Sequence, residues 1–134
     1  MRNVIYGLVC VLVINFIGMY YDFYNFYWFD IVLHLSGGFF VAMLFSKYLE
    51  HHLLPDHKIT NMLIIIGSAV FIGVIWEFAE YSANNIIRPP LQAAYDYYRV
   101  PDFQGDLDDT MKDLLMDTLG ALTMAGLFLR LKRK

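Results

Sequence analysis

Long apolar segments separated by polar connections make up most of the chain. A helix that crosses a bilayer needs about 20 mostly apolar residues, and four segments approach this length: residues 4–20, 28–49, 62–82 and 109–131. Pro89 and Pro90 interrupt the long connection over residues 84–108, which the pattern leaves open as a surface helix or a re-entrant lid. The pattern predicts an all-α integral membrane protein, a single membrane domain over residues 1–134, folded as an up-down bundle of four transmembrane helices.

Composition supports a membrane protein and excludes one class of partner. Apolar residues make up 58% of the 134 residues and charged residues 17%, whereas soluble domains average about 45–50% and about 25%. So short a chain cannot bury that much apolar surface in its own interior, so membrane lipids are the expected surroundings. The net charge of −3 argues against nucleic-acid binding, which requires a basic face, and we expect no nucleic-acid partner. A homo-oligomer or a membrane partner protein remains open.

Basic residues are distributed unevenly between the two predicted ends of the bundle. With four spans, both termini share a side with the second connection, and that side carries seven of the 10 basic residues. The other side has Arg88, Arg99 and Lys112. Because cytoplasmic loops are enriched in Lys and Arg, we expect cytoplasmic termini and an extracytoplasmic loop between the third and fourth helices. The expected location is a bacterial cytoplasmic (inner) membrane.

Acidic residues and one histidine interrupt three predicted helices near their outer ends. Asp30 and His34 are four residues apart, so they share one face of the second helix. Two further faces have acidic residues three or four positions apart, and each continues into small residues, which let membrane helices approach closely. These faces carry Glu77 and Glu80 beside Gly73, and Asp109, Asp113 and Asp117 above Gly120. We therefore expect the three faces to converge on one site in the outer half of the bundle.

The charge of such a cluster must be compensated, because an ionised group in hydrocarbon costs about 2.5 kcal/mol or more. Protonation, pairing with a cation and metal coordination are the available routes. Embedded cations are few, which favours a divalent metal, and oxygen donors with one imidazole suit Mg, Mn, Ca or Fe, with Zn not distinguished. The predicted ligands are Asp30, His34, Glu77, Glu80, Asp109, Asp113 and Asp117. Asp106 and Asp108, by contrast, are predicted to cap the fourth helix.

Three motifs lie within residues 28–124, which are most of the chain. They are Asp30-Ile-Val-Leu-His34 with Ser36-Gly37-Gly38, then Trp76-Glu77-Phe-Ala-Glu80, and finally Gly105-Asp106-Leu-Asp108-Asp109-Thr110 with Asp113, Asp117 and Gly120. Together they resemble the YjdF-like family of bacterial inner-membrane proteins and, more distantly, VanZ-like membrane proteins. The resemblance implies a four-helix membrane fold and a shared polar site, and it implies no particular reaction.

Three functions are compatible with this pattern. The first is a metal-dependent enzyme acting on lipid or lipid-linked head groups, with His34 or Glu80 as general acid or base. Arg88, Arg99 and Lys112 would then bind an anionic head group. The second is a structural or partner-binding membrane subunit, and the third a cation or proton transport module. The apolar cytoplasmic halves of the helices disfavour transport, so the enzyme ranks first.

Overall fold

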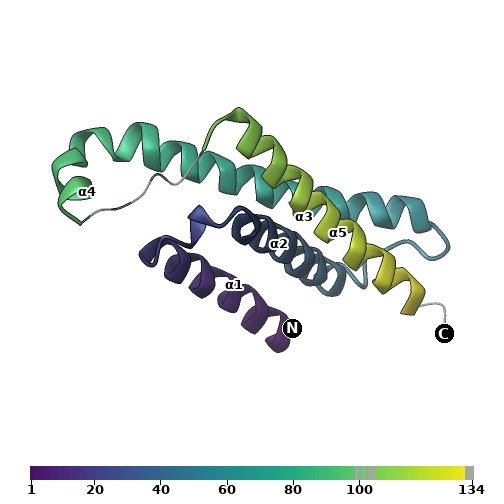
Figure 1. The fold of residues 1–134 in the computed structure, drawn as a ribbon. Coiled ribbons are helices and arrows are strands. Elements are labelled where there is room, and N and C mark those ends of the chain that lie inside the picture. Colours follow the sequence, from purple (N-terminus) through teal and green to yellow (C-terminus); the bar gives the residue numbers. More distant parts are fainter. Residues whose placement is uncertain (99, 101, 103–104, 132–134) are drawn as a thin grey trace.

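The computed structural model describes residues 1–98, 100, 102 and 105–131, and its ordered elements are all helical (Figure 1). The elements predicted from the apolar segments are therefore present, with ends that differ by a few residues. Residues 99, 101, 103–104 and 132–134 lie outside the described part. They include Arg99, which the sequence analysis predicts to bind a head group. The main helices are α1 (Arg2–Tyr20), α2 (Tyr27–Tyr48), α3 (Lys58–Ser82), α4 (Gln92–Tyr98) and α5 (Leu107–Leu131).

Three of these elements are long and apolar enough to cross a membrane: Arg2–Tyr20, Tyr27–Tyr48 and Lys58–Ile87. The last continues α3 through a π-helical turn, Ala83–Ile87. Helix α5 has 25 residues but is less apolar on average, because its first half carries most of its charges. The described residues thus give three apolar spans, and the fourth predicted span stays a prediction for α5.

Helix α2 lies at the centre of the bundle, with α5 and α3 packed against it and α1 on another side (Figure 1). A tight turn containing the 3-10 segment Phe23–Asn25 joins α1 to α2, and Asp22 adopts a left-handed conformation there (φ 57°). The start of α1 and the end of α5 lie toward one end of the bundle, and α4 lies toward the other. This arrangement is that of antiparallel neighbours joined in sequence.

Small residues bring α5 close to α2, as the sequence predicts. A side chain on Gly38 would collide with the backbone of Asp117, and one on Gly120 would collide with the backbone of Leu35. In the half of the bundle away from α4, an apolar core lies between α2, α3 and α5. It consists of Ala42, Ile65, Ala69, Ala121, Met124 and Ala125.

The distribution of polar and apolar side chains is inverted relative to a soluble protein. Phe16 and Phe71 are each 63% exposed, whereas Asp113 and Asp117 are only 3% and 6% exposed. Ionisable side chains are almost never fully buried unless paired, and large exposed apolar surfaces mark contacts with another apolar phase. The outer surface of the bundle is therefore suited to lipid, and its interior holds the charged groups.

The long connection after α3 contains helical turns and one short helix. The 3-10 segment Pro89–Leu91 leads into α4, which extends beyond the end of the bundle (Figure 1). Arg88 anchors the returning chain: its guanidinium pairs with Asp102, donates a hydrogen bond to the carbonyl of Val100 and lies 5.0 Å from the centre of the Tyr95 ring. The connection therefore includes a short helix, and the two predicted forms, a surface helix and a re-entrant lid, both stay predictions.

Candidate metal centre

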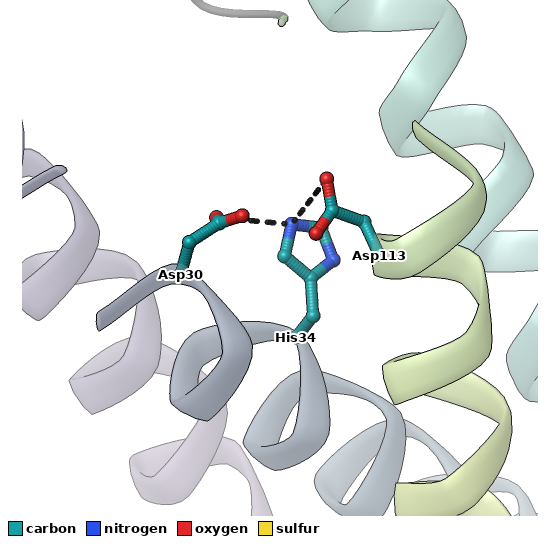
Figure 2. A group of neighbouring side chains, drawn as sticks. All are labelled: Asp30, His34 and Asp113. Carbon is teal, nitrogen blue, oxygen red and sulfur yellow. Dashed lines mark ion pairs between the residues drawn. The ribbon is translucent and has the colours of Figure 1, made fainter. Parts of the chain in front are cut away.

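The first turns of α2 present Asp30 and His34 to Asp113 on α5 (Figure 2). His34 Nε2 lies 3.6 Å from Asp30 Oδ1 and 3.9 Å from Asp113 Oδ2. One donor atom from each of the three residues lies within 4.8 Å of the others. These separations allow one ion to contact all three side chains after small adjustments, because metal–ligand bonds are about 2.0–2.6 Å long.

The second ring nitrogen of His34 also faces a carboxylate. His34 Nδ1 lies 3.5 Å from Asp117 Oδ2, one helical turn along α5 from Asp113. A metal-binding histidine typically donates its other ring N–H to a carboxylate, which fixes the ring's tautomer and orientation. Asp117 is placed for that role, which leaves Nε2 directed toward Asp30 and Asp113.

Glycines on two helices determine where Asp117 lies. Gly38 contacts its backbone, and a side chain on Gly73 would collide with its carboxylate. A side chain on Gly37 would lie 3.7 Å from Asp117 Oδ1. The missing side chains therefore create the space in which this carboxylate reaches the imidazole.

Asp113 is the most deeply buried member of the cluster. It is 3% exposed, and its buried Oδ1 atom has no hydrogen-bond donor within the described residues. A buried acceptor without a donor is costly, and a carboxylate oxygen with a free lone pair is a suitable ligand for a hard cation. The donor set of carboxylates with one imidazole therefore fits a divalent ion chemically.

The other predicted ligands lie around this group. Glu77 is buried on α3 and Glu80 is half-buried one turn further along. Asp109 forms an ion pair with Lys112, whose Nζ atom also lies 3.7 Å from Asp30 Oδ2. The group with donor atoms within 4.8 Å, searched among the described residues, contains Asp30, His34 and Asp113 and neither the two glutamates nor Asp109.

Of the cations predicted to bind a head group, Arg88 and Lys112 contact the protein's own groups. Arg88 holds Asp102 and the connection after α3, as described above. Lys112 lies at the edge of the cluster, where its side chain is 29% exposed and pairs with two carboxylates. Arg99 lies outside the described residues. Of the three, Lys112 is therefore the one that the structure places beside the cluster.

Two residues near the cluster were not predicted as part of it. The Tyr24 hydroxyl donates a 2.8 Å hydrogen bond to Asn15 Oδ1 on α1. Desolvation raises the pKa of Tyr24 above its usual value, and nearby carboxylates raise it further: Asp30, Glu80, Asp113 and Asp109. Asn15 is the one amide within the apolar stretch 4–20. Its isolated polar side chain in an apolar helix is the feature of the sequence that could have marked it as a site residue.

The predicted capping role of Asp106 is confirmed. Its Oδ1 atom accepts a 3.1 Å hydrogen bond from the backbone N–H of Asp109, at the start of α5. This is the contact that a capping carboxylate makes with the otherwise unpaired N–H groups of a helix start. Asp106 therefore serves the helix end and is a suitable control for substitutions in the cluster.

Comparisons with known proteins point to a membrane protein. Residues 1–134 match the family described as "Predicted membrane protein (DUF2238)". A Thermotoga maritima protein described as uncharacterized is 34% identical over 120 residues, which cover 86% of this chain and 55% of the relative. The chain thus spans about half the length of that relative. No solved structure matches significantly.

Proposed function

This chain belongs to the DUF2238 family of predicted membrane proteins, and we propose that its buried aspartate–histidine cluster binds a divalent metal ion. We further propose that the protein is a metal-dependent enzyme acting on lipid or lipid-linked head groups. In this proposal α5 is the fourth span, both termini are cytoplasmic and the membrane is a bacterial inner membrane. The YjdF-like resemblance belongs to the same proposal, as a subdivision of the family.

One observation carries the metal proposal: donor atoms of Asp30, His34 and Asp113 lie within 4.8 Å of one another, and Asp113 Oδ1 has no donor in the described chain. The carboxylates of Asp30, Asp109, Asp113 and Asp117 outnumber the two basic side chains that contact them, those of His34 and Lys112. Carboxylates this close repel one another unless a cation or protons compensate their charge. A divalent ion supplies that compensation and makes use of the histidine as a ligand.

The position of the cluster supports a reaction on a head group. A divalent ion bound there would supply Lewis-acid polarisation of a phosphoryl or acyl group. Both nitrogens of His34 face carboxylates, so we keep His34 as a ligand and assign the general acid–base role to Glu80. Glu80 contributes to the raised pKa of Tyr24, and this supports the assignment of its carboxylate to the same site. Lys112 would contact an anionic head group from the edge.

Packing at the other end of the bundle argues against transport. The core there is apolar, and its two buried polar side chains form local hydrogen bonds. Ser46 donates to the Met43 carbonyl, and Asn61 pairs with the backbone of Leu54. A proton or cation relay needs ionisable or polar groups through the full bilayer, and among the described residues no buried ionisable side chain lies in this half.

Metal binding is tested by the thermal stability of the purified protein in detergent. A ligand that binds the folded state alone stabilises it by about 2.7 kcal/mol at a hundredfold excess over Kd. We expect Mn²⁺ or Mg²⁺ to raise the melting temperature, chelator to reverse the change, and acid to remove it, because the ligands must be deprotonated. Asp113→Asn should abolish this response and Asp106→Asn should retain it. Indifference of the wild-type protein to both metal and chelator would refute the metal site.

Enzymatic activity requires a separate test. The protein is reconstituted into vesicles of bacterial polar lipids with metal or chelator, and the lipids and released head groups are analysed by mass spectrometry. We expect a product that forms only with metal and is lost in Asp113→Asn. Metal binding without any such product would leave the structural or partner-binding subunit as the function of the site.

A further inference from the structure

A cavity of about 410 Å³ lies beside the candidate metal centre, between α1, α2 and α3. It exists because α1 packs against α2 and, within the described residues, makes no comparable contact with α3 (Figure 1). The volume is within the range of about 300–1,000 Å³ typical of ligand pockets. The cavity is partly open between the helices, on a side where exposed apolar residues indicate lipid.

The lining of the cavity changes along its length. Its polar residues lie in the half of the bundle nearer α4 or in the turn that joins α1 to α2: Asn15, Tyr24, His34, Trp76 and Asp117. Apolar side chains line the remainder, down to Leu8 on α1, Phe45 on α2 and Ala69 on α3. A molecule that fits must therefore be apolar over most of its length and polar at the end beside His34 and Asp117.

The length and the surroundings of the cavity favour a hydrocarbon chain as its occupant. Lining residues on α2 run from Leu33 to Phe45, about 18 Å at 1.5 Å per residue. A lipid chain spans one leaflet, about half of the roughly 30 Å hydrocarbon core of a bilayer, so its length is comparable. It is also the molecule that surrounds these helices in a membrane.

We propose that this cavity holds one hydrocarbon chain of a lipid substrate, with the polar end of that lipid directed to the cluster of Asp30, His34 and Asp113. The inference deepens the proposed function, on which it rests, by assigning the substrate to the class of acyl-chain or isoprenoid-chain lipids. His34 links the two parts of the site: Nε2 faces Asp30 and Asp113, and Nδ1 faces Asp117 in the cavity lining.

Trp76 allows the proposal to be tested directly, because it lines the cavity and is one of only two tryptophans. The other, Trp28, is 59% exposed and is removed by Trp28→Phe. A phospholipid brominated in the middle of its chains is titrated into this variant in excess detergent micelles that contain no other phospholipid. We expect saturable quenching of Trp76 fluorescence. Quenching that rises linearly with the brominated fraction would indicate contact with bulk lipid alone and would overturn the proposal.

Matched substitutions on one helix separate the cavity from the lipid surface. Val41 lines the cavity, whereas Val32 is 48% exposed and does not. On the Trp28→Phe background, Val41→Phe should reduce the saturable quenching at least twofold, and Val32→Phe should leave it unchanged. Equal quenching in the two variants would contradict the proposal. If Val41→Phe does not fold, Val11→Phe in the α1 lining and Val9→Phe on its exposed face form an equivalent pair.

The melting-temperature response to metal, measured on the same variants, distinguishes failure of this proposal from failure of the metal site. Val41→Phe should keep the response, because it leaves the cluster intact. Loss of saturable quenching in a protein that still responds to metal would refute the cavity alone. Saturable quenching in a protein indifferent to metal would refute the metal centre and leave a lipid-chain site.

Discussion

Gly38→Ala tests whether close approach of α2 and α5 assembles the cluster. The added Cβ would collide with the carbonyl oxygen of Asp117 and lie 2.7 Å from its carbonyl carbon and Cα. Ordinary carbon contacts are about 3.5–4.0 Å, so the helices must separate by roughly 1 Å. All three colliding atoms belong to the backbone and cannot move by a change of rotamer. Asp113 and Asp117 would then move away from His34.

The energetic effect is isolated by comparison with the same substitution elsewhere. Replacing glycine by alanine within a helix stabilises by roughly 0.5–1 kcal/mol, whereas overpacking costs about 1–3 kcal/mol. A Cβ on Gly126 in α5 meets nothing within 4 Å in the described chain. Gly126→Ala therefore keeps the gain without the collision, and the difference between the two variants, about 1–3 kcal/mol, measures the collision alone.

The free energy of unfolding of both variants is measured by equilibrium unfolding in mixed micelles, monitored by circular dichroism. The melting temperature of each variant is then measured at increasing metal concentration. We expect Gly38→Ala to be less stable than Gly126→Ala and to lose most of its response to metal. The reasoning would be refuted if Gly38→Ala matched Gly126→Ala in stability and kept the full response. That result would mean that the contact between α2 and Asp117 is not needed for the cluster.

Three further predictions concern other parts of the chain. Because the pKa of Tyr24 is raised on folding, wild-type stability should fall as the pH rises above about 10, and Tyr24→Phe should show a smaller fall in the same unfolding assay. Asn61 is 6% exposed and hydrogen-bonds both backbone groups of Leu54, at 3.0 and 2.8 Å, so Asn61→Ala should lower the free energy of unfolding by about 1–3 kcal/mol; an unchanged value would contradict this. Lys134→Cys in a Cys10→Ala background should resist an impermeant thiol reagent in intact cells, and labelling without lysis would reverse the predicted orientation.

The helices and the positions of the charged groups along them follow from the sequence alone. Long, mostly apolar stretches predict helices of membrane-spanning length, and the four-residue spacing of Asp30 and His34, like that of Asp113 and Asp117, places each pair on one face. These are local properties, because the angular position of a residue around a helix depends only on its place in the sequence. Three helices each carry an acidic face that continues into small residues, and this shared pattern predicts that the three faces meet at one site.

Which residues meet is decided by the tertiary structure. Spacing treats Asp109, Asp113 and Asp117 as equivalent members of one stripe, yet Asp109 pairs with Lys112, Asp113 joins Asp30 and His34, and Asp117 faces the other side of the imidazole. The cavity is decided in the same way, because it depends on α1 packing against α2 and leaving a gap beside α3. Distances between helices depend on their relative shift and on the glycine contacts that bring the backbones together. Periodicity along one helix carries no information about that shift, so the sequence predicts the faces and only the packed bundle determines the site.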